Sequence, residues 1–202
     1  MRIGVTGSSG LVGFNFCKEA LKNNETLNIL IRKDTEYLKQ IDANIFYGDL
    51  NDKKVLDEFC EGCDVIVHSA AMISIGFDSY KEVYEVNYVG TKNLLDLIRF
   101  KQENVSKRPI FFHFSTDEVY GDIESGEHVE TDLLHPSNPY SAAKAAADML
   151  VLAWASTYGI EYVILRPTNN YGIGQYPEKL VPLSVKNLQR GLKIRLHMME
   201  RQ

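Results

Sequence analysis

The chain has 202 residues, of which 45% are hydrophobic and 24% are charged, and its formal net charge is -5. This is enough apolar sequence to bury the core of one domain, and it excludes a disordered chain. The acidic balance argues against nucleic acid or an anionic membrane as a general partner. The opening residues MRIGVTGSSG lack the apolar stretch of a signal peptide, and no run has membrane-spanning length, so a cytoplasmic address is expected.

Short apolar runs rich in Val, Ile and Phe alternate with helical patterns along the whole chain. The runs RIGVT, LNILI, NIFYG, DVIVHSA, PIFFHFS and EYVILRP predict six strands. The expected helices are Leu11 to Asn23, Lys53 to Cys60, Tyr80 to Lys101, Pro139 to Tyr158 and Leu180 to Arg190. Continuous apolar strands between amphipathic helices predict an α/β fold with a doubly wound parallel sheet, a Rossmann fold, over residues 1–202.

The first predicted strand ends in a glycine turn, VTGSSGLVG. Gly7 allows the tight turn, Gly10 lets the backbone approach a pyrophosphate, and Gly13 allows close packing of the helix. Leu11 and Val12 open the helix, whose free N–H groups suit an anion. The pattern therefore predicts a dinucleotide site, with an ordinary strand-to-helix turn as the alternative.

Three cysteines are present, and two of them form the sequence CEGC at Cys60 and Cys63. An odd count without a secretory signal argues against a disulfide framework. The pair lacks a second pair or a nearby histidine, so cysteines at a helix end and in a loop are expected rather than a metal or redox site.

Tyr140 and Lys144 stand four residues apart in PYSAAKAAADML, on one face of an expected helix. An ammonium near a phenol favours the phenolate, so Lys144 is expected to lower the pKa of Tyr140 from its reference of about 10. Together with the glycine turn and Thr116 at the end of a strand, this pair resembles the catalytic set of the short-chain dehydrogenase/reductase superfamily, which implies that Tyr140 acts as a base.

The GxxGxxG spacing and this Tyr-Lys pair resemble the extended short-chain dehydrogenase/reductase family, the NAD-dependent epimerases and dehydratases. The resemblance implies NAD or NADP as cofactor. NAD-preferring members usually carry an acid at the end of the second strand, where this chain has Arg32 followed by Lys33. The fork and charge of arginine suit a 2′-phosphate, which favours NADP; the alternative is that Arg32 stacks near the adenine or faces solvent.

The resemblance assigns further cofactor contacts to several positions. Asp49 and Leu50 correspond to the adenine contact after the third strand, and Ala70 and Ala71 to the contact after the fourth. Asn87 corresponds to a residue that braces the active-site backbone, although a helix residue with local bonds is the alternative. The cofactor-binding set also includes Tyr140, Lys144 and Asn169.

The segments FHFSTDEVYGD, PYSAAKAAADMLVLAWASTYGI and NNYGIGQYPEKLVPL resemble the dTDP-glucose 4,6-dehydratases of this family. These oxidise the sugar at C4, eliminate water across C5 and C6, and return hydride to C6. The resemblance implies that Thr116 holds the 4-oxygen, Glu118 removes the C5 proton and Asp117 protonates the leaving hydroxyl. The alternative for these three residues is a cap and first turn of a helix.

The resemblance places the sugar nucleotide against Thr116, Asn170 and the segment Glu178, Lys179 and Leu180. A solvated helix start is the alternative for Glu178 and Lys179. The segment MISIGFDSY departs from the dehydratase pattern, so a nucleotide-sugar 4-epimerase or an NADP-linked reductase is the alternative function. The smaller C-terminal substrate domain of the family is expected to be truncated or missing, no metal is expected, and the resemblance implies a homodimer.

Overall fold

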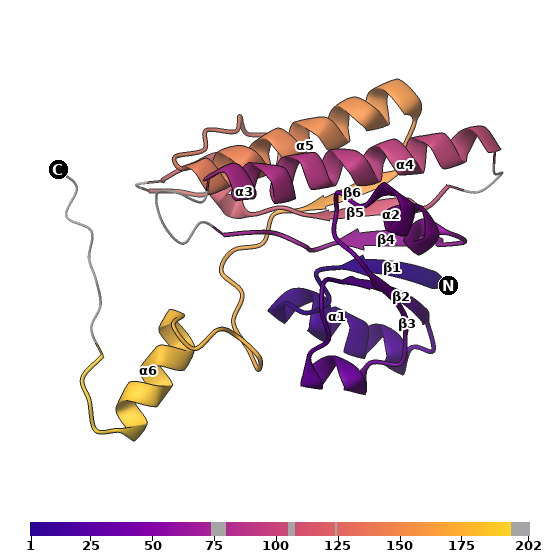
Figure 1. Ribbon diagram of the computed structural model, residues 1–202. Helices are drawn as coiled ribbons and strands as arrows, with labels where there is room; N and C mark the ends of the chain where they lie inside the picture. The colour runs from indigo at the N-terminus through magenta and orange to yellow at the C-terminus, as the bar shows by residue number, and fades with distance from the viewer. Residues whose placement is uncertain (74–79, 105–107, 124, 195–202) are drawn as a thin grey trace. The chain divides into compact units, whose positions relative to one another are not determined.

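The computed structural model describes residues 1–73, 80–104, 108–123 and 125–194, and its core is one six-stranded parallel sheet (Figure 1). The strands lie in the order β3-β2-β1-β4-β5-β6. They are β1 (Arg2–Thr6), β2 (Thr26–Ile31), β3 (Asn44–Tyr47), β4 (Val65–His68), β5 (Ile110–Phe114) and β6 (Tyr162–Leu165). The prediction of a doubly wound parallel sheet is confirmed, since this is the Rossmann strand order.

The helices between the strands cover both faces of this sheet. They are α1 (Leu11–Lys22), α2 (Lys53–Cys60), α3 (Tyr80–Tyr84), α4 (Gly90–Asn104) and α5 (Pro139–Tyr158). A 3-10 helix, η1 (Glu36–Gln40), follows β2, a π-helix, η2 (Glu85–Val89), joins α3 to α4, and a 3-10 helix, η3 (Asp117–Tyr120), follows β5. The expected helix Tyr80 to Lys101 is therefore α3, η2 and α4 in succession.

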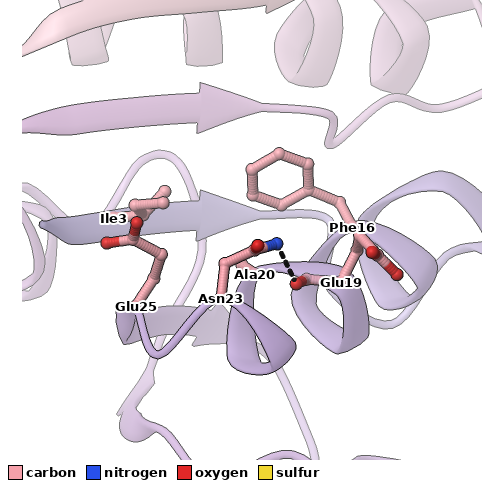
Figure 2. A pocket seen from close by; sticks show the side chains of 6 residues that line it. All are labelled: Ile3, Phe16, Glu19, Ala20, Asn23 and Glu25. Atoms are coloured by element: carbon pink, nitrogen blue, oxygen red, sulfur yellow. Dashed lines mark hydrogen bonds between the residues drawn. The ribbon is translucent and has the colours of Figure 1, made fainter.

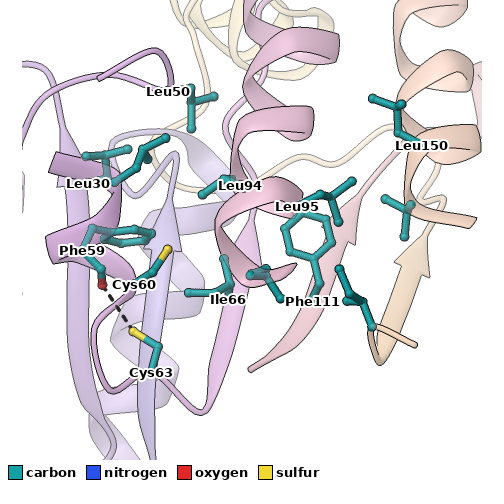
Figure 3. Close-up of a cluster of buried hydrophobic side chains, with 14 residues drawn as sticks. Leu30, Leu50, Phe59, Cys60, Cys63, Ile66, Leu94, Leu95, Phe111 and Leu150 are labelled. Atoms are coloured by element: carbon teal, nitrogen blue, oxygen red, sulfur yellow. Dashed lines mark hydrogen bonds between the residues drawn. The ribbon is translucent and has the colours of Figure 1, made fainter. Parts of the chain in front are cut away.

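Alternate residues of each strand build two separate cores, as the two-residue period of a strand requires. Val5, Ile29 and Val67 pack under α1 and η1 on one face. Leu30, Ile66 and Phe111 pack under α2, α4 and α5 on the other face, together with Leu94 and Leu95 (Figure 3). Burial on both faces explains why the strands read as continuous apolar runs.

The carboxyl ends of β1 and β4 form the point where the strand order reverses. β1 pairs with β2 on one side and with β4 on the other, so the connections leave in opposite directions. Ligands of open α/β sheets bind at this switch point. The segments that follow β1, β4 and β5 are therefore the part of the fold where a site is expected.

Helix α5 has strong signals at both ends. Asn138 accepts a hydrogen bond from the Ser141 backbone at 2.9 Å, and the Ser141 hydroxyl accepts one from the Asn138 backbone at 3.2 Å. This reciprocal capping box precedes Pro139 at the first helical position. Gly159 ends the helix with a left-handed φ of 67°. The caps fix the position of Tyr140 in the first turn.

The two cysteines of CEGC are part of the core under α2 (Figure 3). Cys60 ends the helix and Cys63 lies in the following loop, where its thiol donates to the Phe59 carbonyl at 3.4 Å. Both positions are those expected from the sequence.

The chain divides into two compact units, residues 1–170 and 171–202. The sheet lies entirely in the first unit, whereas the sequence predicted one Rossmann unit through residue 202. The second unit contains α6 (Leu180–Gln189), none of whose residues is buried. In the described part of the chain, no helix combines the length and the apolar character needed to cross a membrane.

Candidate active site

The glycine turn leaves no room for side chains at two of its three glycines. A Cβ on Gly7 would lie 2.5 Å from the Ala70 nitrogen, and Gly7 has a left-handed φ of 74°. A Cβ on Gly13 would lie 2.3 Å from the Gly7 carbonyl oxygen. Gly10 is less restricted, because the nearest atom to its Cβ would be that same oxygen at 3.3 Å. The turn packs α1 closely against β1 and the end of β4.

The amino end of α1 can receive an anion. Gly10 is the N-cap and makes no side-chain cap, so the first-turn N–H groups, including those of Leu11 and Val12, have no side-chain partner at the cap. Ser8 was not predicted, yet its hydroxyl is buried and has no hydrogen-bond partner among the described residues. These orphan donors fit the pyrophosphate of a dinucleotide. The signal in the sequence was a serine inside the glycine turn.

Two alanine substitutions separate the packing role of this turn from its binding role. Gly13→Ala should lower the free energy of unfolding by about 1–3 kcal/mol, because its Cβ meets backbone that cannot move aside. Gly10→Ala should cost less stability, because Gly10 has a φ of -92° that alanine adopts, but its methyl group should weaken cofactor binding at least about tenfold. Thermal unfolding and calorimetric titration measure the two effects. A Gly13→Ala protein as stable as wild type would contradict this packing.

The predicted adenosine contacts differ in how their side chains are used. Arg32 directly follows β2 and is exposed. The Asp49 carboxylate accepts from the Asn51 backbone at 2.7 Å and so closes its own turn. Leu50 is a core residue, and a Cβ on Gly90 would lie 2.6 Å from its side chain. Because the Leu50 side chain is in the core, Leu50 would contact a ligand through its backbone.

Asn87 holds the backbone that follows β4. Its side chain accepts from the Met72 nitrogen at 2.8 Å and donates to the Met72 oxygen at 2.9 Å. Asn87 is 1% exposed and lies in the π-helix, a type of distortion frequent at functional sites. The side chain of Asn87 bonds to Met72, outside its own helix. The alternative of a helix residue with only local hydrogen bonds therefore does not describe this side chain. Residues 74–79, which carry most of MISIGFDSY, lie outside the described residues.

Thr116, Asp117 and Glu118 form a short turn at the carboxyl end of β5. Thr116 is the N-cap of η3 and accepts from the Glu118 backbone at 3.3 Å, so the capping alternative describes part of its role. Its hydroxyl also donates to Asp117 at 3.2 Å. Asp117 is half-buried and Glu118 is exposed. The two acids thus meet different surroundings although they are adjacent in sequence.

Asn138 connects this acidic turn to helix α5 and was missed in the sequence. Its amide donates to the Glu118 carboxylate at 3.1 Å, while its oxygen caps the helix that carries Tyr140. This bond fixes the position of the Glu118 carboxyl group beside the first turn of α5. The signal was the asparagine before Pro139, which could be read as a cap but not as a partner of Glu118.

The expected lowering of the Tyr140 pKa is wrong for the protein by itself. Burial, followed by the negative charges of Glu118 and Asp117, raises the pKa of Tyr140 to about 12. Glu118 is held close to the start of α5 by its hydrogen bond with Asn138, two positions before Tyr140. The sequence showed the Lys144 ammonium, which favours the phenolate. It did not show that Tyr140 is buried or that Glu118 and Asp117 oppose its ionisation. Activation of Tyr140 therefore needs a further positive charge in the site.

Lys144 follows Tyr140 by one turn of α5 and is almost completely buried. Its ammonium donates to the Phe114 carbonyl at 2.5 Å, and its Nζ lies 3.5 Å from Nε2 of His113. Burial lowers the pKa of Lys144 to about 8, and the Asp148 carboxylate opposes this lowering. The side chain is thus fixed on β5, directly before the turn with the two acids.

The remaining predicted residues follow β6. Asn169 and Asn170 are exposed, and the Asn170 amide donates to the Thr168 carbonyl at 3.2 Å. Glu178, Lys179 and Leu180 belong to the second unit, where Lys179 is the N-cap of α6. The structure brings together the predicted residues of the first unit around the strand ends. The three residues of the second unit remain a prediction.

A surface pocket lies at the opposite end of the sheet and contains none of the predicted residues. Its lining comes from β1, α1 and the following turn: Ile3, Phe16, Glu19, Ala20, Asn23 and Glu25 (Figure 2). The amide of Asn23 donates to the Glu19 carbonyl at 2.9 Å and closes the end of α1. This pocket is separate from the strand ends that carry the candidate site.

The strand order and the glycine turn at the start of α1 are those of a dinucleotide-binding Rossmann domain. Residues 3–200 match the family described as "NAD dependent epimerase/dehydratase family". The chain therefore belongs to this family, as the sequence indicated.

Similar proteins include both activities of the family name. A dTDP-glucose 4,6-dehydratase of Streptomyces niveus is 35% identical over 96% of this chain and 61% of its own length. The structure of a Bacillus anthracis dTDP-glucose 4,6-dehydratase in complex with NAD is 32% identical, with a TM-score of 0.85 over 96% of this chain and 63% of that one. A Bacillus cereus UDP-glucuronic acid 4-epimerase with NAD is 25% identical, with a TM-score of 0.84 over 96% and 64%. The chain thus spans less than two thirds of these relatives.

Proposed function

We propose that the protein is a nucleotide-sugar 4,6-dehydratase, a lyase that uses a nicotinamide cofactor and acts on dTDP-glucose or a close analogue. The observation that carries the proposal is the pair Asp117 and Glu118 at the end of β5, where Glu118 accepts at 3.1 Å from Asn138, two residues before Tyr140. The dTDP-glucose 4,6-dehydratases among the relatives support it.

Each step of this reaction has a residue suited to it. Tyr140 takes the proton of the 4-hydroxyl, and Thr116 hydrogen-bonds the same oxygen. The resulting ketone acidifies the C5 hydrogen, so that Glu118 removes it as a base while Asp117 gives a proton to the departing 6-hydroxyl. Glu118 accepts a hydrogen bond from Asn138 and is exposed, whereas Asp117 is the less exposed acid. Different surroundings let two carboxyl groups take opposite roles.

The residues around α1 fit a nicotinamide dinucleotide. Its pyrophosphate would lie on the N–H groups of α1, with Ala70, Ala71 and Asn169 along its length and Asn87 bracing the loop beside it. When bound, the cofactor supplies the hydride acceptor for C4, the hydride donor for C6 and a positive ring that lowers the pKa of Tyr140. Lys144, one turn further along α5, would supply a second positive charge on the same side of the helix as Tyr140.

NAD is the cofactor in the structures of the relatives, whereas the exposed Arg32 suits the 2′-phosphate of NADP. If Arg32 contacts that phosphate, Arg32→Asp should shift the ratio of NAD to NADP affinity toward NAD by at least about tenfold. Calorimetric titration of both cofactors measures the ratio, with Lys22→Asp, an exposed lysine in the last turn of α1, as a control for the same charge change. An unchanged ratio in Arg32→Asp would overturn this role.

A nucleotide-sugar 4-epimerase, or an NADP-linked reductase, is the second candidate. It is favoured by the epimerase relative and by the departure of MISIGFDSY from the dehydratase pattern. Epimerisation and reduction would also use Tyr140 and Lys144, but neither reaction needs a base that removes the C5 proton. Asp117 and Glu118 are therefore the residues that distinguish the two candidates.

Incubation of the intact protein with NAD and dTDP-glucose, UDP-glucose and related sugars tests the proposal. A dehydratase forms a 4-keto-6-deoxy sugar, which absorbs in alkali and is lighter than the substrate by one water. An epimerase gives an isomer of unchanged mass. Cofactor binding without a product from any sugar would instead indicate a nucleotide-binding protein without catalysis, and the proposal would be wrong.

We further infer a cytoplasmic homodimer. Apolar side chains remain exposed on α3 and α5, which lie side by side: Tyr80, Tyr84, Met149 and Leu152. Helices α3, η2, α4 and α5 form one layer over the sheet (Figure 1). A second copy packed on this layer would cover these residues, and sedimentation would measure the resulting mass.

A further inference from the structure

A lysine that is 1% exposed, such as Lys144, needs a counter-charge to remain an ammonium. The acids of the turn, Asp117 and Glu118, are not the residues in contact with its Nζ. The ammonium instead contacts the Phe114 carbonyl at 2.5 Å and Nε2 of His113 at 3.5 Å, both from β5. A carbonyl is a good acceptor but carries no net charge, so the compensating charge comes from elsewhere.

Asp148 supplies the negative charge on the same face of α5, one turn after Lys144. Its side chain is 0% exposed. Although burial opposes ionisation, contacts with His113, Ser115 and Arg166 lower the pKa of Asp148, so that it is a carboxylate. Its second oxygen accepts from Nε of Arg166 at 2.9 Å. Asp148 is therefore a charged and fully buried carboxylate on the helix that carries Tyr140 and Lys144.

His113 lies between the lysine and this carboxylate. Its Nε2 is 3.3 Å from Asp148 Oδ1 as well as 3.5 Å from Lys144 Nζ. Burial and the charge of Lys144 lower the pKa of His113 to about 4, so the ring is neutral. Its Nδ1 has no partner among the described residues, and a buried N–H without an acceptor is costly. Nε2 is therefore the ring atom that makes the polar contacts of His113, with Lys144 on one side and Asp148 on the other.

We propose that Asp148 is a positioning residue that, together with His113, holds the buried Lys144 as an ammonium directed at the Phe114 carbonyl, one turn after Tyr140 on the same helix. The proposal rests on the proposed catalytic role of Lys144. Arg166 reduces the effect of Asp148 on Lys144, because its positive guanidinium also binds the Asp148 carboxylate. The same guanidinium donates to the Tyr120 hydroxyl at 2.6 Å. The sequence showed only the Tyr-Lys pair; the residue that supports it lies four positions further along the helix.

The charged and titratable groups around this lysine come from four elements. Asp148 and Tyr140 share its helix, and His113 comes from β5. His68 of β4 stacks on His113 with ring centres 5.6 Å apart, and its pKa is lowered by burial, by His113 and by Lys144, so it adds no charge. Arg166 follows β6 and faces Asp148. Among these groups Asp148 is the anion that favours the ammonium.

Direct titration of Lys144 tests the proposal without any sugar substrate. Intact protein with carbon-13 at the lysine ε positions is followed by NMR against pH, and the Lys144 signal is assigned by its loss in Lys144→Met. In Asp148→Asn, which keeps the shape of the side chain, the titration midpoint should fall by about one pH unit or more. In Arg166→Gln the carboxylate remains and the opposing cation is lost, so the midpoint should not fall.

The matched control is Asp96→Asn, which removes a partly buried acid that pairs with Lys92 at 2.7 Å and accepts from Trp154 at 3.1 Å. It should leave the Lys144 midpoint unchanged. The midpoint in Asp148→Asn staying at the wild-type value, or falling equally in Arg166→Gln, would overturn the proposal. If the dehydratase activity is also present, the alkaline limb of its pH-rate profile should move to lower pH in Asp148→Asn, whereas a purely structural defect would lower the rate equally at every pH.

Discussion

Tyr140→Phe should lower kcat for the conversion of the sugar nucleotide by about 10²- to 10⁴-fold, the usual contribution of a positioned acid-base group. The substitution removes only the hydroxyl, and the caps at Asn138 and Gly159 continue to hold the helix. Because C4 oxidation comes first, no later intermediate should form. The measurement is the initial rate of product formation, with calorimetry to show that the cofactor still binds.

Tyr158→Phe on the same helix is the matched control for Tyr140→Phe. The Tyr158 ring packs against Arg99 and Trp154, and these ring contacts do not depend on its hydroxyl. Its rate should stay close to that of wild type. If Tyr140→Phe retained the wild-type rate while remaining folded, Tyr140 would not be the base, and the assignment of this site would be wrong.

Glu118→Gln should stop the reaction after C4 oxidation. The amide cannot remove the C5 proton, so formation of the 4-keto-6-deoxy product should fall by about 10²- to 10⁴-fold. The oxygen of glutamine can still accept from Asn138, which leaves the cap of α5 intact. The expected sign is enzyme-bound reduced nicotinamide, seen by its ultraviolet absorbance, without loss of water from the sugar.

Glu127→Gln, an exposed acid in the loop before α5, serves as the control for Glu118→Gln. It should form product at the wild-type rate. A Glu118→Gln protein that dehydrates the sugar as fast as wild type would show that another group removes the C5 proton. Epimerisation that is unaffected by both Glu118→Gln and Asp117→Asn would favour the epimerase candidate.

The sequence was sufficient to predict the fold because its local signals agree with one another. Buried parallel strands read as continuous apolar runs, and the glycine turn placed the first helix, so the expected strands and helices correspond closely to those of the structure. The division after residue 170 was not predicted. The predicted helix at residues 180–190 fits the helical period but, unlike the others, buries no residue, and periodicity alone does not reveal that.

The environment of the site could be predicted only in part. Motif spacing placed Tyr140, Lys144 and the acidic turn together, but the sign of the Tyr140 pKa shift depends on burial and on which charges face the ring. These depend on contacts distant in sequence. Asn138 reaches Glu118 across 20 positions and Arg166 reaches Asp148 across 18, distances along the chain that no local motif records.

The most direct test of the dehydratase proposal follows the hydrogen on C4 of the sugar. The intact protein is incubated with NAD and dTDP-glucose deuterated at C4, and the product is analysed by NMR and mass spectrometry. The proposed reaction predicts a product lighter by one water, with the deuterium now on C6. A product of unchanged mass that retains deuterium on C4 would contradict the proposal and would show a 4-epimerase.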